Sequence, residues 1–264
     1  MIDLSGKIAL VTGAGLGIGR GCALELARAG ADLVINDRPD SPDIENAAEE
    51  IRALGRQCTT IESDVFSREG CENLVQRGLD AVGRIDILVS NPAFGKRTAF
   101  LDFDPEDFDR VIDATYKAGF HMSQLVARHM VERGGGGKII FISSVQAEMP
   151  FARNLPYGAA KAAVNHMAQT ISVELIGHRI NVNAIEPGWI DTPNERATFG
   201  DAIDDEGGKL PWGRMGLPAD IGHAAAFLAS DAADYITGAV IPVDGGFRFG
   251  HLRADELIKE LDPA

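Results

Sequence analysis

Short apolar segments alternate with longer helical patterns along almost the whole sequence. The apolar segments cover 7–13, 31–37, 57–63, 84–90, 138–144, 179–185 and 238–244. Most are nearly continuous apolar runs, which is typical of strands covered by helices on both faces. Helical patterns lie near 17–30, 44–54, 68–83, 105–132, 155–176 and 218–230. The alternation predicts an α/β fold with one doubly wound parallel sheet.

The length of 264 residues fits one large domain, which we expect to span 1–250. The polar, acidic segment at 192–214 is too long for an ordinary connection, so we predict a binding or substrate loop there. A short amphipathic pattern at 251–264 predicts a C-terminal helical tail that serves docking or oligomer contact.

Composition excludes several classes of protein. The formal net charge of −14 makes nucleic acid an unsuitable partner, and it weighs against an acidic carrier protein as substrate donor. Three cysteines and six histidines show no disulfide or metal-ligand spacing, so we expect no metal and a reducing compartment. With no signal peptide or membrane-length apolar run visible, the predicted location is the cytoplasm, away from membranes.

The stretch "TGAGLGIGRG" at 12–21 follows the first predicted strand and opens the first predicted helix. Missing side chains in such a turn let backbone amides approach a pyrophosphate at the helix N-terminus. A glycine pattern alone is weak evidence, but the strand before it and the helix after it supply the required context. The predicted cradle comprises Gly13, Gly15, Leu16, Gly17, Ile18 and Gly19.

Asp37 ends the second predicted strand, eighteen residues after Gly19. A carboxylate there accepts hydrogen bonds from a ribose 2′-hydroxyl and repels a 2′-phosphate. Arg38 would partly offset that repulsion, while Leu16 adds no cation to the glycine turn. We therefore predict NAD as the cofactor, with NADP as the less favoured alternative.

Tyr157 is the only one of three tyrosines with a lysine, Lys161, four residues later. This spacing places both side chains on one helix face, where the ammonium would lower the pKa of the phenol. Ser144 ends a predicted strand thirteen residues earlier, where its hydroxyl could meet the same substrate oxygen. The three residues predict acid/base chemistry on an alcohol or a carbonyl.

Together these motifs resemble the short-chain dehydrogenase/reductase family. Matching stretches are "TGAGLGIG", "SDV", "DILVSNPA", "IFISS", "YGAAK" and "NVNAIEPGWIDTP", in family order over about 1–247. The resemblance implies a Rossmann-type sheet of seven strands in the order 3-2-1-4-5-6-7, in a homotetramer or homodimer. It also implies hydride transfer between a nicotinamide cofactor and a CH–OH group.

The resemblance assigns roles to individual residues. Tyr157 would be the acid/base, Lys161 would tune it and hold the nicotinamide ribose, and Ser144 would position the substrate oxygen. The remaining cofactor contacts implied are Asp64 and Val65 at the adenine, Asn91 and Ala93 at the adenosine ribose, and Pro187, Gly188, Ile190 and Thr192 at the nicotinamide and phosphates.

Three positions depart from the family pattern. "SNPA" at 90–93 replaces the usual Asn-Asn-Ala-Gly, so Ala93 places a methyl group near the ribose. Thr115 stands where a catalytic asparagine is expected, and its hydroxyl could bond back into its own helical turn while its carbonyl still supports a proton relay. Glu186 replaces a small residue, and either pairing with a cation or facing the substrate pocket would explain it.

Substrate residues are expected on the ends of the fourth to sixth strands and on the long loop. Gln146, Glu148 and Trp189 would suit a hydroxyl-rich ring, as in sugar and polyol dehydrogenases of the family, including glucose 1-dehydrogenase-like members. Further candidates are Phe94, Lys96, Met149, Glu195 and Trp212. Two alternatives remain open: an NADPH-dependent reductase of 3-oxoacyl or other carbonyl groups, and a non-catalytic NAD-binding sensor.

Overall fold

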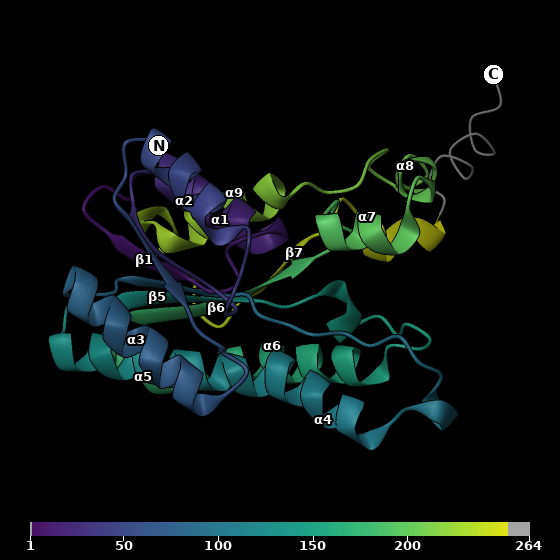
Figure 1. Ribbon diagram of the computed structural model, residues 1–264, viewed down its shortest axis with the longest axis horizontal. Coiled ribbons are helices and arrows are strands. Elements are labelled where there is room, and N and C mark those ends of the chain that lie inside the picture. Colours follow the sequence, from purple (N-terminus) through teal and green to yellow (C-terminus); the bar gives the residue numbers. More distant parts are fainter. Residues whose placement is uncertain (1, 253–264) are drawn as a thin grey trace.

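A computed structural model describes residues 2–252, in which a parallel sheet lies between two layers of helices (Figure 1). The strands are β1 Ile8–Val11, β2 Asp32–Asp37, β3 Cys58–Glu62, β4 Ile87–Ser90, β5 Gly137–Ile142, β6 Ile180–Pro187 and β7 Val240–Val243. They pair in the order β3-β2-β1-β4-β5-β6-β7, and every neighbouring pair is parallel. The predicted seven-stranded sheet and its strand order are confirmed.

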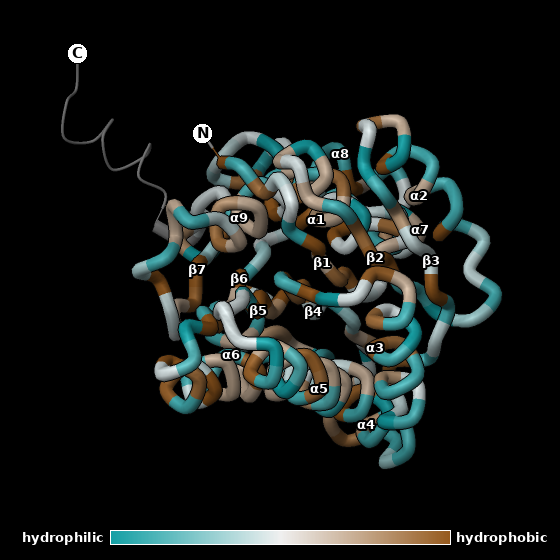
Figure 2. Tube along the Cα trace, turned by 90° about the vertical axis from the view of Figure 1, so that its left-hand side faces the viewer, coloured by the Kyte–Doolittle hydropathy of each residue, from teal (hydrophilic) through white to brown (hydrophobic). Residues whose placement is uncertain are grey.

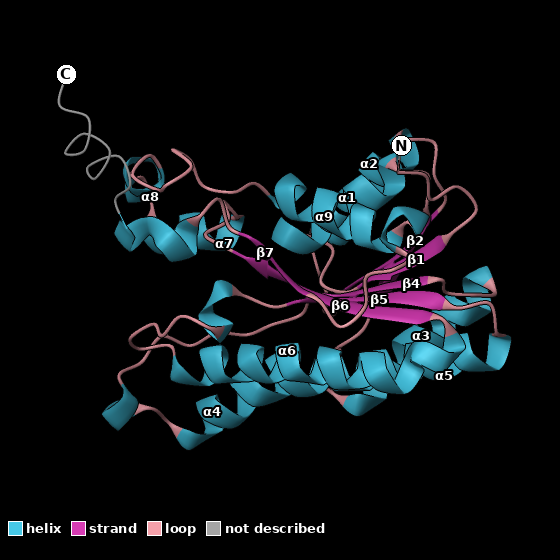
Figure 3. Ribbon diagram, turned by 180° about the vertical axis from the view of Figure 1, so that it is seen from behind, coloured by secondary structure: helices cyan, strands magenta, loops and turns pink. Residues whose placement is uncertain are grey.

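The helices divide between the two faces of the sheet. They are α1 Gly17–Arg28, α2 Ile44–Ala53, α3 Arg68–Val82, α4 Pro105–Ile112, α5 Ala118–Arg133, α6 Leu155–Leu175, α7 Pro193–Phe199, α8 Ala202–Gly207 and α9 Pro218–Ala229. Figure 3 shows α1, α2 and α9 on one face, and α3, α5 and α6 on the other. Helices on both faces explain why the strands read as continuous apolar runs.

Residues along each strand alternate between the two hydrophobic cores. On β1, Ala9 and Val11 pack under α1 and α9, whereas Leu10 packs toward α3 and α5. β4 repeats the pattern with Val89 on the first face and Leu88 on the second. Figure 2 shows the resulting band of hydrophobic strands between the helices. Truncating a buried leucine such as Leu10 to alanine typically costs about 2–5 kcal/mol of stability.

The helix predicted over 105–132 is instead three consecutive pieces. A π-helical segment, Asp113–Lys117, separates α4 from α5. Such bulges insert an extra residue into a helix and often occur at functional sites. Gly134, Gly135 and Gly136 follow α5 with positive φ, so the glycine run ends the helix.

The long segment at 192–214 is not the structureless loop that its polar composition suggests. It contains α7 and α8, which lie beyond β7 at the end of the sheet (Figure 1). The hydroxyl of Thr192 begins α7 by accepting a hydrogen bond from the backbone NH of Glu195, at 3.3 Å. A 3-10 helix at Phe247–Leu252 follows β7, and the predicted tail lies outside the described residues from 253 onward.

Two findings on residues 2–252 bear on partners. No helix among them is long and apolar enough to cross a membrane. Nor does this part of the chain gather three His, Cys, Asp or Glu side chains that could hold a metal ion.

The strand order reverses between β1 and β4, and ligands of open α/β sheets bind at the carboxyl ends of strands beside such a point.

Candidate active site

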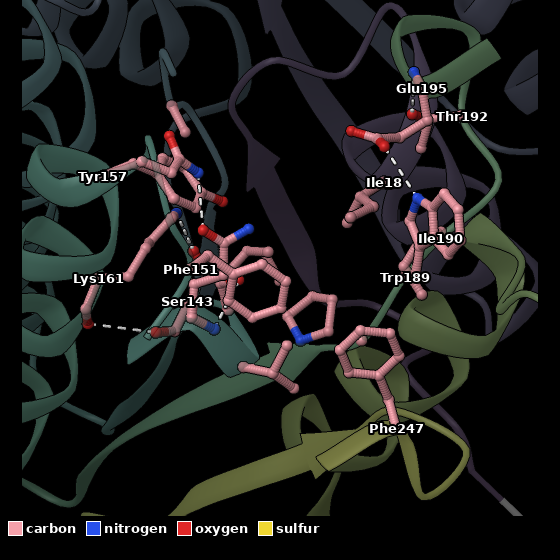
Figure 4. Close-up of a pocket in the computed structure, with 18 of the residues that line it drawn as sticks. Ile18, Ser143, Phe151, Tyr157, Lys161, Trp189, Ile190, Thr192, Glu195 and Phe247 are labelled. Atoms are coloured by element: carbon pink, nitrogen blue, oxygen red, sulfur yellow. Dashed lines mark hydrogen bonds between the residues drawn. The ribbon is translucent and has the colours of Figure 1, made fainter. Parts of the chain in front are cut away.

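A cavity of about 800 Å³ opens at the carboxyl ends of the central strands (Figure 4). Ile18 of α1 lies on one side of it, and Tyr157 and Lys161 of α6 lie on another. The segment after β6 and Phe247 after β7 complete its wall. This volume is large enough for part of a dinucleotide together with a small substrate.

The glycine turn brings its own backbone into close contact. Gly13 and Gly17 adopt positive φ values of 61° and 54°, which side chains disfavour. A Cβ atom on Gly19 would lie only 2.0 Å from the carbonyl oxygen of Gly13. Leu16 precedes α1 without any side-chain cap, so the first helical amides are not bonded by a capping side chain. An anion such as a pyrophosphate fits this arrangement.

Thr12 and Asn91 hold the glycine turn against β4. The side-chain amide of Asn91 donates to the carbonyls of Thr12 and Gly13, both at 3.2 Å. The hydroxyl of Thr12 accepts from the backbone NH of Asn91 at 3.1 Å. Asn91 and Ala93 both line the cavity, so the "SNPA" segment, which departs from the family pattern, forms part of the site. Thr12 was not predicted, although it begins the quoted glycine stretch.

Asp37 lies directly over the glycine turn. A Cβ atom on Gly15 would lie 2.1 Å from its Oδ2, so only glycine leaves room for the carboxylate. The carboxylate accepts hydrogen bonds from the Ser41 hydroxyl at 2.7 Å and from the backbone NH of Arg38 at 2.8 Å. A carboxylate at the end of β2 and against the turn suits a ribose hydroxyl, and its role in binding a ribose stays a prediction.

The predicted adenine contacts after β3 differ in exposure. The side chain of Val65 is buried in the core beneath the sheet, which leaves only its backbone for a ligand. Asp64 is exposed, and its carboxylate accepts from the backbone NH of Phe66 at 3.0 Å.

The segment after β6 closes against the glycine turn. A Cβ atom on Gly17 would lie 3.4 Å from the Thr192 methyl group, so residues 175 positions apart in the chain meet here. Gly188 donates to the carbonyl of Val243 at 3.1 Å, and Pro187 and Ile190 line the cavity beside it. The predicted nicotinamide and phosphate contacts therefore gather at one edge of the cavity.

Ser144, Tyr157 and Lys161 converge on the cavity floor. The Lys161 ammonium donates to the carbonyl of Ile142 at 2.6 Å and lies 5.6 Å from the centre of the Tyr157 ring. The Ser144 hydroxyl accepts from the backbone NH of Gln146 at 3.2 Å. Figure 4 shows Tyr157 and Lys161 side by side on α6.

Burial dominates the protonation of the pair. It raises the pKa of Tyr157 to about 12, although the hydrogen bond to Ser144 acts in the opposite direction. Burial also lowers the pKa of Lys161 to about 7. The predicted lowering of the tyrosine pKa by the ammonium is therefore wrong, because desolvation is the larger effect.

Thr115 lies in the π-helical segment and is 2% exposed. Its hydroxyl donates to the carbonyl of Phe94 at 3.1 Å and accepts from the backbone NH of Phe94 at 3.2 Å. The expected bond back into its own turn is thus replaced by a bond to the segment after β4. Since the hydroxyl is engaged twice, a proton relay at this position would depend on the backbone carbonyl.

The predicted substrate residues separate into two groups. Gln146 and Trp189 line the cavity, and the Trp189 indole NH donates to Glu195 Oε2 at 2.8 Å (Figure 4). Glu148 does not line it, because its carboxylate pairs with Arg248 at 2.8 Å on the outside. Of the further candidates, Glu195 lines the cavity, whereas Phe94, Lys96, Met149 and Trp212 do not.

Glu186 is fully buried, and pairing with a cation explains it. Its carboxylate accepts from Arg248 at 2.8 Å and from the Asn165 amide at 2.6 Å. Arg248 also binds Asp244, at 3.0 Å, and this cluster fixes the segment that carries Phe247. Phe247 stacks on Phe151 at the cavity wall, with ring centres 6.2 Å apart. Arg248 and Phe247 follow the last strand and belong to no motif, so neither residue could be predicted from the sequence.

A dinucleotide cradle and a Ser-Tyr-Lys set in one cavity define a nicotinamide-dependent oxidoreductase. A family model described as enoyl-(acyl carrier protein) reductase matches residues 13–248. The chain is 39% identical over 251 residues to 2-dehydro-3-deoxy-D-gluconate 5-dehydrogenase of Escherichia coli K12, covering 93% of this chain and 96% of the relative.

Two solved structures agree with this. A short-chain type dehydrogenase/reductase from Mycobacterium marinum is 36% identical with a TM-score of 0.88, covering 93% of this chain and 97% of that one. A 7α-hydroxysteroid dehydrogenase, complexed with NADH and 7-oxo glycochenodeoxycholic acid, is 35% identical with a TM-score of 0.88, covering 93% and 96%. The chain belongs to the short-chain dehydrogenase/reductase family. Like the dehydrogenases of this family, it interconverts alcohols and carbonyls.

Proposed function

We propose that the protein is an NAD-dependent dehydrogenase of a secondary alcohol on a sugar or polyol, with Tyr157 as its acid/base. The convergence of Ser144, Tyr157 and Lys161 beside the glycine turn carries this proposal. The sugar or polyol class is supported by the similarity to a gluconate-derivative dehydrogenase and by the polar groups of Gln146 and Trp189 in the cavity wall.

The residues present fit a dinucleotide. No capping side chain occupies the first amides of α1, and the Asp37 carboxylate above Gly15 suits a free 2′-hydroxyl rather than a 2′-phosphate. NAD is therefore the proposed cofactor. Arg38 directly follows Asp37 in the sequence, and its positive charge is what would support NADP instead. When bound, the nicotinamide ring accepts a hydride from the alcohol carbon or returns it to a carbonyl.

Residues of the protein itself transfer the proton of the substrate alcohol. The Tyr157 phenolate takes the alcohol proton while the Ser144 hydroxyl holds the same oxygen. With a pKa near 12, Tyr157 is almost entirely protonated at neutral pH, so a positive charge close to it is required to form the phenolate that oxidation needs. Lys161, whose pKa is lowered to about 7, can exchange protons near neutral pH and relay them away from Tyr157.

Replacing Tyr157 with phenylalanine tests the proposal. We expect turnover, followed as absorbance at 340 nm over a panel of sugars, polyols and secondary alcohols, to fall at least about a hundredfold. NADH binding, followed by fluorescence titration, should change little because the ring is retained. Wild-type kcat/KM should be higher with NAD than with NADP. Undiminished turnover by the variant contradicts the role of Tyr157, and NADH binding without turnover by the wild type favours a non-catalytic sensor.

Other predictions from the sequence await experiment. A homotetramer or homodimer, a cytoplasmic location and a domain boundary near 250 stay predictions. Light scattering on the purified protein measures the oligomeric state directly.

A further inference from the structure

The residues that line the cavity include more cations than anions, although the net charge of the protein is −14. Its charged lining residues, besides Lys161, are Arg97, Arg153, Glu195, Glu206 and Lys209. Lys209 and Glu206 pair at 2.6 Å, which leaves Glu195 as the one other carboxylate in the lining beside two arginines. Arg97 is 3.7 Å from Glu195, and that carboxylate already accepts from the indole of Trp189.

Arg153 has no acidic partner within residues 2–252, although it lines the cavity. Its backbone adopts a φ of +66°, a conformation that is unfavourable for any residue with a side chain. The carbonyl of Arg153 accepts from the backbone NH of Thr98, the neighbour of Arg97, at 2.9 Å. The fold therefore holds together two segments that each contribute an arginine to the lining of the same cavity.

Asn154 supplies a second, independent sign of a ligand. Its side chain is 9% exposed, and its Nδ2 donates to Gln146 at 2.7 Å. Its Oδ1 is buried without a hydrogen-bond partner among the described residues, and it lines the cavity three positions before Tyr157. A buried acceptor without a donor destabilises the protein, and a substrate hydroxyl would supply the missing donor.

We infer that the substrate is a hydroxylated carboxylic acid, with a hydroxyl bound by Asn154 and its carboxylate bound by Arg153 together with Arg97. A guanidinium is suited to a carboxylate because its planar donors match both oxygens. Trp189, Phe151 and Phe247 line the same cavity and cover the carbon chain between the two polar ends. The inference rests on the proposed function and narrows its substrate from sugars and polyols to their acids.

Equilibrium binding to the NADH-saturated enzyme tests the inference, with D-gluconate as the acid and D-glucitol as its neutral counterpart. Neither alcohol can react with the reduced cofactor, so calorimetry measures binding alone. The wild type should bind D-gluconate at least about tenfold more tightly than D-glucitol, since a charged hydrogen bond contributes about 1.5–3 kcal/mol. Arg153→Met should remove most of that preference while leaving D-glucitol binding unchanged, and Arg153→Lys should restore part of it.

Arg179 offers a matched control, because it too is an exposed arginine with positive φ, at 58°, but lies outside the cavity. Arg179→Met should leave both affinities unchanged. Equal binding of the two probes by the wild type, or an equal loss of both in Arg153→Met, overturns the inference. Failure of the proposed function has a different signature, namely tight D-gluconate binding with no absorbance change at 340 nm in the presence of NAD and any alcohol of the panel.

Discussion

The cofactor end and the substrate end of the cavity are built in different ways. At the cofactor end, the backbone of the glycine turn packs against itself, with Gly19 tight against Gly13 and Asp37 above Gly15. At the substrate end, side chains from distant segments meet, and charged pairs such as Arg248 with Glu186 hold them. Backbone contacts tolerate almost no substitution. Substitutions in a wall of side chains, in contrast, can change which ligand binds while the fold is kept.

Gly19→Ala should give the largest effect, because its methyl group would fall 2.0 Å from the Gly13 carbonyl oxygen. The turn must shift to accommodate it, and we expect NADH affinity to fall at least about a hundredfold, or close to 3 kcal/mol. Fluorescence titration measures the affinity, and circular dichroism checks that the fold persists.

Gly177→Ala is the matched control, since nothing lies within 4 Å of the added methyl group. Its NADH affinity should equal that of the wild type. If Gly19→Ala also binds NADH normally, the close backbone contact is not what shapes the cofactor end.

Arg248→Met should have the next largest effect, confined to the substrate end. It leaves the fully buried Glu186 without its cation, and removing one partner of a buried pair costs about 3 kcal/mol or more. The segment with Phe247 should loosen, which raises KM for the alcohol, while the dissociation constant of NADH is unchanged. Steady-state kinetics and thermal unfolding measure the two effects.

Two further variants sharpen this result. Arg179→Met removes an exposed pair with Asp234 of similar length, 2.9 Å, and should cost no more than about 1 kcal/mol. The double variant Arg248→Met with Glu186→Gln should recover much of the lost stability, because the buried charge is gone. A double variant as unstable as the single one contradicts the charge-pairing explanation.

The contrast between the cofactor end and the substrate end explains which parts of the structure could be predicted from the sequence. The sheet, its order and the cofactor end follow from local patterns: apolar runs, a glycine turn after a strand, and Asp37 at a fixed distance. The substrate end depends on contacts such as that of Arg248 with Glu148, which lie 100 residues apart and share no motif. Glu148 was predicted to face the substrate because its pairing with Arg248 could not be seen in the sequence.

Asn154 and Thr115 show that side-chain contacts could not be predicted even close to a recognised motif. Asn154 precedes Tyr157 by three residues, and only the structure shows that its carbonyl oxygen is buried without a donor. Thr115 was identified from its alignment, but its partner Phe94 lies in another segment. Residue types near a motif are therefore predictable as part of a site, while the direction of each side chain depends on packing from elsewhere.

Lys161 lies between the two ends, and it should make the stability of the protein depend on pH. Burial lowers its pKa from the ordinary 10.5 to about 7 in the folded protein. Between these values the unfolded chain binds more protons than the folded one, so stability should rise with pH from about 7 toward 10.5. Below pH 7 both states are protonated, and the full cost of the buried ammonium is present.

Lys161→Met should remove this pH dependence while abolishing turnover. The variant loses the donor to the Ile142 carbonyl, which costs the same at every pH, so the informative quantity is the difference in Tm between wild type and variant. That difference should shift in favour of the wild type by about 5 °C between pH 6.5 and pH 9. A constant difference across this range would mean that Lys161 stays protonated in the folded protein. Its ammonium would then be a fixed charge for holding a ribose, and the proton relay would have to begin elsewhere.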